Sequence, residues 1–332
     1  MSVRPFLRGA ALLAATVLVT GCGSGDTESS GDAAATSSPT GSGAFPVTVE
    51  TAFGPVEVPE EPERVVALGW GDAETALALG VQPVGASDWL AFGGTGVGPW
   101  AEDLYDQAPE IIDTLEPSLE AIAALEPDLI LDTRSSGAQD RYDALDQIAP
   151  TIGPPAGVGQ YQTTWQQQLD LVGQALGRSE QADELQADVE QQFTEAAAAN
   201  PEFAGTEVAV AAYTSEGFGA YVRGDGRVDF MESLGFVNEP AIQDLAGESF
   251  FVSISEEQVP LLDAPLTVVF PIFVDAAQIT GNPLWQSLPS VQQGNAVVLE
   301  DQTLVNAFSS GSALGTRYAL ENAVPLFAET LG

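Results

Sequence analysis

The chain has 332 residues, enough for about two domains, and 48 acidic residues against nine basic ones give it a formal net charge of −39. All nine basic residues are arginines, there is no histidine, and there is one cysteine. These counts exclude Ser-His-Asp and Cys-His catalysis, His-ligated metal sites, an internal disulfide and an iron–sulfur cluster. They also argue against nucleic-acid binding, which depends on clustered Lys and Arg.

The first segment has the pattern of a targeting signal. Arg4 and Arg8 precede an apolar run over residues 9–20 that is too short to span a membrane. The run leads into Cys22, the only cysteine, and resembles a bacterial lipobox, in which that cysteine is lipidated. We expect a lipoprotein signal peptide over residues 1–21 and a lipid anchor on Cys22. An ordinary secretory signal with an incidental cysteine is the alternative.

Residues 22–45 are rich in Gly and Ser and are predicted to form a flexible tether. From residue 46 the pattern changes to short apolar runs separated by helical stretches. Strands are predicted at residues 47–51, 55–58, 64–68, 84–86 and 128–132, and helices at 71–79 and 119–125. The alternation of strand and helix predicts parallel βαβ units, so residues 46–160 are assigned to an N-terminal α/β lobe.

Residues 163–199 contain no proline and carry one apolar stripe from Trp165 to Phe193. This pattern predicts a bridging helix, assigned to residues 161–200, which Gly177 can bend or interrupt. The α/β pattern then resumes. Strands are predicted at residues 206–213, 266–270 and 296–299, and helices at 228–234, 283–288 and 314–331. The predicted fold class is therefore α/β, with two Rossmann-like lobes (the second over residues 201–332), one long α-helix between them and a ligand cleft between the lobes.

Several motifs follow one another in an order that resembles a known family. They are Pro62–Leu68, Leu125–Ile130, Ile148–Thr151, Asp229–Phe236 and Asn282–Pro289. This ordered set is similar to the class III substrate-binding proteins of ABC importers, the iron-siderophore and cobalamin binders, over residues 47–332. The resemblance implies an extracytoplasmic monomer with no catalysis and no cofactor of its own, iron being present only within the bound siderophore complex. It implies an ABC permease dimer as partner and no nucleic acid.

Three predicted loop regions should line the ligand cleft. Trp70 lies between two glycines, and Trp89 follows the next strand. Arg134 directly follows the strand at 128–132, at the edge where α/β ligands usually sit, and its guanidinium could hold siderophore oxygens. An ion pair with Asp132 or Asp140 is the alternative for Arg134. The ligand residues expected from the second lobe are Tyr213, Tyr221, Arg223, Arg227 and Phe273.

The expected ligand is a ferric siderophore, and one loop predicts the charge of the complex. Residues 270–276 form a strand-end loop without a basic residue. Family members that bind catecholates tend to carry a cation there, so the loop favours a neutral or cationic ferric hydroxamate over a trianionic ferric catecholate. Cobalamin, haem and bare ferric iron remain alternatives. A carboxylate-based hydrolase and a structural lipoprotein are alternatives of a different class.

The resemblance also implies a docking role for one glutamate on each lobe. In the family these glutamates pair with arginines of the membrane permease, and Glu74 and Glu232 occupy the corresponding motif positions. Two separated charges fix the orientation of a partner and raise its association rate. The alternative is that both are ordinary solvated carboxylates in a very acidic chain.

Overall fold

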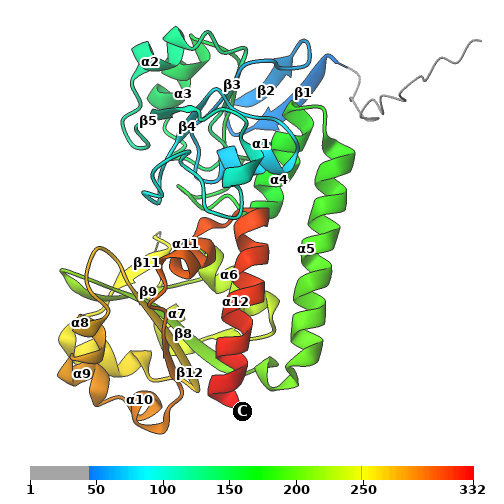
Figure 1. Ribbon diagram of the computed structural model, residues 1–332. Helices are drawn as coiled ribbons and strands as arrows, with labels where there is room; N and C mark the ends of the chain where they lie inside the picture. The colour runs from blue at the N-terminus through cyan, green and yellow to red at the C-terminus, as the bar shows by residue number, and fades with distance from the viewer. Residues whose placement is uncertain (1–44, 248) are drawn as a thin grey trace, which may run out of the picture. The chain divides into compact units, whose positions relative to one another are not determined.

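The computed structural model describes residues 45–247 and 249–332, which form two α/β lobes (Figure 1). The predicted signal peptide, Cys22 and all but the last residue of the tether lie outside the described residues. Among the described residues, no helix combines the length and the apolar character needed to cross a bilayer.

The first lobe is built on a parallel five-stranded sheet in the order β5-β4-β3-β6-β7. The strands are β3 (Val65–Ala67), β4 (Gly85–Ser87), β5 (Glu110–Ile112), β6 (Leu129–Leu131) and β7 (Thr151–Ile152). Strands β3, β4 and β6 are buried along their whole length, as expected when helices cover both faces of a parallel sheet. The lobe also contains the hairpin β1 (Val47–Thr51) and β2 (Gly54–Val58), α1 (Asp72–Ala78), η1 (Glu102–Leu104), α2 (Leu119–Ala124) and α3 (Gln139–Asp146).

The second lobe has a mixed six-stranded sheet in the order β11-β9-β8-β12-β13, with β10 also beside β8. Its strands are β8 (Glu207–Thr214), β9 (Gly217–Tyr221), β10 (Val237–Asn238), β11 (Phe251–Ser253), β12 (Leu266–Pro271) and β13 (Ala296–Val298). Strand β9 is antiparallel to both β8 and β11, and the other pairs are parallel. The helices include α6 (Gly226–Ser233), α7 (Pro240–Gln243), α8 (Ala277–Thr280), α9 (Pro283–Gln286), α10 (Pro289–Gln293), α11 (Gln302–Ser310) and α12 (Ala313–Leu331), with η2 (Pro201–Phe203) and η3 (Glu256–Leu262).

The bridging segment predicted over residues 161–200 consists of two helices, with the interruption at the glycine where the sequence allowed one. These are α4 (Trp165–Ala175) and α5 (Ser179–Ala199), and the break falls at Gly177. Gly177 has a φ of 65°, its N–H bonds to the carbonyl of Gln174, and the N–H of Arg178 bonds to the carbonyl of Gly173. This is the Schellman pattern, in which a left-handed glycine ends a helix.

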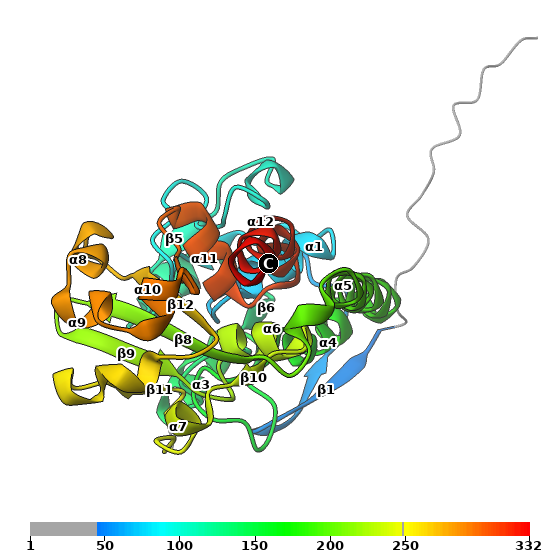
Figure 2. The same cartoon turned by 90° about the horizontal axis from the view of Figure 1, so that it is seen from below.

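The two helices serve different lobes. Helix α4 packs against β1 and α1 of the first lobe, whereas α5 packs along α12 of the second. Figure 1 shows α5 running from one lobe to the other, and Figure 2 shows it beside α12. Helix α12 in turn contacts α1, so the lobes meet through direct contacts as well as through α5.

The break at Gly177 can be tested by whether Gly177→Ala raises or lowers the free energy of unfolding. In a continuous helix, Gly177→Ala would stabilise the protein by about 1 kcal/mol, since alanine is the better helix former. With Gly177 left-handed, the same change should lower the free energy of unfolding by about 1–2 kcal/mol. Urea unfolding measures the difference, and a stabilised variant would contradict the break at residue 177.

Candidate functional site

The loops that follow β3, β4 and β5 line a groove of about 570 Å³ on the first lobe. This is the carboxyl edge of a parallel sheet, where α/β proteins usually bind ligands. Ile111 and Leu115 are 44% and 66% exposed there, although both are large and apolar. The groove is lined by Trp70, Asp88, Trp89, Ala91, Ile111, Ile112, Asp113, Thr114 and Leu115.

Three aromatic rings form a stack beside this groove. The centroid of Trp70 lies 4.4 Å from that of Trp89, with the rings 7° apart, and 4.2 Å from that of Tyr161, with the rings 26° apart. Both faces of Trp70 are therefore covered, which leaves its edge to line the groove. The two tryptophans that the sequence singled out do come together, and Trp89 is the outer ring on the groove side.

Asp72 fixes the loops beneath the stack. Its carboxylate accepts hydrogen bonds from the backbone N–H of Gly69 at 2.9 Å and of Thr133 at 3.0 Å, from the Thr133 hydroxyl, and from the Gln168 amide at 2.7 Å. It thereby joins the loop after β3, the loop after β6 and helix α4. The side chain is fully buried, and that burial raises the pKa of Asp72 to about 6.

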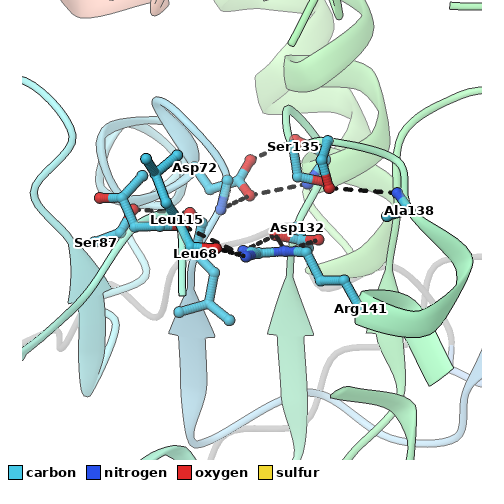
Figure 3. A network of polar contacts seen from close by, with 12 residues as sticks. Leu68, Asp72, Ser87, Leu115, Asp132, Ser135, Ala138 and Arg141 are labelled. Atoms are coloured by element: carbon cyan, nitrogen blue, oxygen red, sulfur yellow. Dashed lines mark hydrogen bonds and ion pairs between the residues drawn. The ribbon is translucent and has the colours of Figure 1, made fainter. Parts of the chain in front are cut away.

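An ion pair between Arg141 and the buried Asp132 supports the loop after β5 (Figure 3). The Nη2 of Arg141, in α3, lies 2.8 Å from the Asp132 carboxylate. Its Nη1 donates to the carbonyls of Thr114 and Leu115, each at 3.4 Å. Burial raises the pKa of Asp132, and the bonds from Arg141 oppose that rise. The alternative interpretation paired Arg134 with Asp132. The structure pairs Asp132 with Arg141 instead.

Arg134 lies between the lobes rather than in the groove lining. It is 5% exposed, its Nε donates to the carbonyl of Tyr161 at 3.0 Å, and its Nη1 donates to the carbonyl of Ser310 at 3.0 Å. Burial lowers its pKa to about 10. Its guanidinium carbon is 5.9 Å from the centroid of Trp89, which lines the groove, whereas Arg134 itself does not. A direct bond from Arg134 to a ligand therefore stays a prediction.

Two of the predicted ligand residues in the second lobe are core residues. Tyr221 is 3% exposed, and the guanidinium carbon of Arg227 lies 3.9 Å from the centroid of its ring. Arg227 makes two hydrogen bonds of 2.8 Å to Asp225. Although burial alone would lower it, the pKa of Arg227 is raised by Asp225. Both side chains are buried and have partners within the second lobe, so the ligand role predicted for Tyr221 and Arg227 stays a prediction that this arrangement does not favour.

The other three predicted residues of the second lobe have separate environments. Tyr213 packs edge-on against Phe218 with centroids 4.6 Å apart, and Arg223 forms an exposed ion pair with Glu232 at 2.7 Å. Phe273 follows β12 and is 97% exposed, with a φ of 55° that is rare for a bulky residue. Of these three side chains, Phe273 is the one fully open to solvent.

Comparisons with known proteins decide the family. A family model described as periplasmic binding protein matches residues 65–303. The chain belongs to the periplasmic binding protein family. The predicted class, two α/β lobes of the class III type, is confirmed, and the solved structures that resemble it have the same fold.

Several known periplasmic binding proteins resemble the chain along most of its length. The probable siderophore-binding lipoprotein YfiY of Bacillus subtilis (strain 168) is 28% identical over 96% of both chains. A periplasmic solute-binding protein from Mycobacterium smegmatis is 27% identical, with a TM-score of 0.75, over 86% of this chain and 99% of that one. PiaA of Streptococcus pneumoniae, solved in complex with ferrichrome, is 25% identical, with a TM-score of 0.74, over 86% and 98%.

In this periplasmic binding protein Glu74 lies in the interior, which does not favour the permease-docking role predicted for it. Glu74 is 4% exposed, and its carboxylate accepts hydrogen bonds from the N–H of Gly98 at 3.2 Å, the indole of Trp100 at 3.0 Å and the hydroxyl of Ser312. Burial raises its pKa. A carboxylate enclosed in this way has no surface to offer a permease.

Sequence reasoning missed the residues that support the site. Arg141 belonged to no motif, the supporting role of Asp72 was not expected, and Ile111 and Leu115 had the pattern of ordinary apolar residues. One signal was available for Arg141: arginines are so scarce in this acidic chain that each can be expected to have a specific partner.

Proposed function

We propose that the protein captures a ferric siderophore outside the cytoplasm and delivers it to the permease of an ABC importer. The iron would be part of the bound complex. Membership of the periplasmic binding protein family supports this proposal. So do the relatives, since one is named as a siderophore-binding lipoprotein and a solved relative holds ferrichrome.

The observation that carries the proposal is the groove at the carboxyl edge of the first sheet. It combines the Trp89 ring with the exposed side chains of Ile111 and Leu115, a surface suited to the apolar backbone of a chelator. The groove would contact one side of the ligand. The other side would face the second lobe, where the side chain of Phe273 is exposed.

The charge of the groove favours a neutral or cationic ferric hydroxamate. None of its nine described lining residues is basic, and two are aspartates. Asp88 accepts hydrogen bonds from the N–H groups of Phe92 and Gly93 at 2.8 and 2.7 Å, which shapes a turn without cancelling the negative charge. A trianionic ferric catecholate would meet two carboxylates and no basic side chain in this lining.

Trp89→Ala tests the groove. Calorimetric titration with ferrichrome should show binding to the unaltered protein and about tenfold weaker binding to the variant, corresponding to about 1.4 kcal/mol for a lost aromatic contact. Leu326→Ala, an exposed apolar residue on α12, is the matched control and should bind as the unaltered protein does. Equal affinity of both variants, or a preference for ferric enterobactin over ferrichrome, would contradict the proposal.

We infer that the protein binds its ligand without changing it. The family is one of solute-binding proteins, which supports a binder over the carboxylate-based hydrolase. Mass spectrometry of the ligand recovered after the titration should show the intact siderophore, and a hydrolysed product would establish catalysis.

Glu232 is the docking carboxylate that we retain. Its side chain is 30% exposed at the end of α6 and is paired with Arg223, which a permease arginine would have to replace. Glu232→Gln should lower radioactive iron uptake several-fold in cells and leave ferrichrome affinity unchanged. Glu329→Gln, an exposed glutamate of α12, is the control. Unchanged uptake with Glu232→Gln would remove the docking role.

We also propose that the chain is anchored by a lipid on Cys22. The lipobox-like sequence supports this, and the relative YfiY is named a lipoprotein. Metabolic labelling with an alkyne fatty acid should mark the unaltered protein and not Cys22→Ser, which should appear in the soluble extracytoplasmic fraction. An unlabelled native protein would contradict the anchor.

A further inference from the structure

A three-residue turn in the second lobe makes close contacts with the first. Ser310, Gly311 and Ser312 connect α11 to α12, and we call this turn the corner. Ser310 is 1% exposed and Ser312 is 1% exposed, so the corner is enclosed although it is a turn. Two ionisable side chains of the first lobe enclose it, Arg134 and Glu74.

Arg134 contacts the first half of the corner. Its Nη1 donates to the carbonyl of Ser310 at 3.0 Å. Gly311 has a φ of 56°, and a Cβ added there would overlap the Nη1 of Arg134. Gly226 of α6 is also near, since a Cβ added there would be 3.7 Å from Nη2. Gly311 is therefore the residue whose lack of a side chain makes room for this arginine.

Glu74 contacts the second half of the corner. The hydroxyl of Ser312 donates to the Glu74 carboxylate, and the same oxygen accepts the N–H of Gly315 at 3.1 Å as the N-cap of α12. Helix α12 has 19 residues, so a carboxylate at its N-terminus is favoured by the helix dipole. On the first-lobe side, Gly98 and Trp100 complete the acceptor bonds of Glu74.

Separating the lobes at the corner would break hydrogen bonds to two buried ionisable side chains, Arg134 and Glu74. Unpaired polar groups away from water are costly, so these bonds resist small displacements more strongly than apolar contacts do. Helix α5 is one connection between the lobes. The corner between α11 and α12 is a second connection.

We propose that Arg134 and Glu74 are positioning residues that clamp the Ser310–Ser312 corner and thereby set the resting separation of the two lobes. The clamp itself does not depend on the identity of the ligand. Its consequence for affinity rests on the proposed function, because the ligand groove of the first lobe and Phe273 of the second face a common ligand only at the right separation.

Gly311→Ala tests the Arg134 half of the clamp. Gly294→Ala is its matched control, since Gly294 also ends a helix with a left-handed φ of 84° but has open space around an added Cβ. Both changes carry the backbone cost of a left-handed alanine, and only Gly311→Ala displaces Arg134. Ser312→Ala and Ser118→Ala form a second matched pair, because both serines cap helices and only Ser312 contacts Glu74.

The measurement is the distance distribution between the lobes by pulsed EPR on the full chain without ligand. Spin labels on cysteines introduced at the exposed positions Glu120 in α2 and Gln278 in α8, with Cys22→Ser, report it. We expect a shifted or broadened distribution for Gly311→Ala and Ser312→Ala, and the unaltered distribution for both controls. Unaltered distributions in Gly311→Ala and Ser312→Ala, with folded protein by circular dichroism, would overturn the clamp.

Calorimetric titration with ferrichrome then separates the two proposals. An affinity about tenfold lower in Ser312→Ala than in Ser118→Ala, a pair that leaves the predicted ligand residues unaltered, supports the link between lobe separation and capture, and equal affinities overturn that link. If the unaltered protein binds no ferric siderophore while the distance distribution still shifts, the clamp stands and the proposed function fails.

Discussion

Burial of ionisable side chains at the carboxyl edge of the first sheet is the constraint on which the rest of the structure depends. Asp72, Asp132, Glu74 and Arg134 are each 5% exposed or less. A buried charge without partners would cost several kcal/mol, so each of these groups draws a separate piece of chain to itself. Asp72 bonds to two loops and to α4, and Asp132 bonds to Arg141 of α3, which contacts the groove wall. Arg134 and Glu74 bond to the corner of the second lobe.

This arrangement explains how so acidic a protein can present a defined ligand surface. Most of the 48 carboxylates affect solubility and long-range charge, whereas the few that are buried determine loop geometry. The ligand groove can then be apolar and aromatic without being loose, since its wall at Leu115 is bonded through its backbone to Arg141. Pre-formed sites of this kind lose little entropy when they bind.

Much of the fold could be predicted from local patterns, and the site only in part. Short apolar runs marked the strands, and Gly177 marked the break that makes two helices of an expected one. Trp70 and Trp89 were found because a strand-end loop is a local feature. The burial of Glu74 could not be predicted because its partners Trp100 and Ser312 are 26 and 238 residues away in the sequence. Arg227 has near partners in the sequence, Asp225 and Tyr221, but the burial of Arg227 and Tyr221 beside Phe270 of β12 is a result of tertiary packing that the sequence does not show.

We propose that an uncharged or cationic ferric complex occupies the groove beside Trp89. Native mass spectrometry of the protein recovered from iron-starved cultures of its host tests this proposal, because the cell itself selects the ligand. We expect one bound ferric siderophore per chain, with no net negative charge on the complex. Recovery of a trianionic ferric catecholate, or of cobalamin or haem, would contradict it.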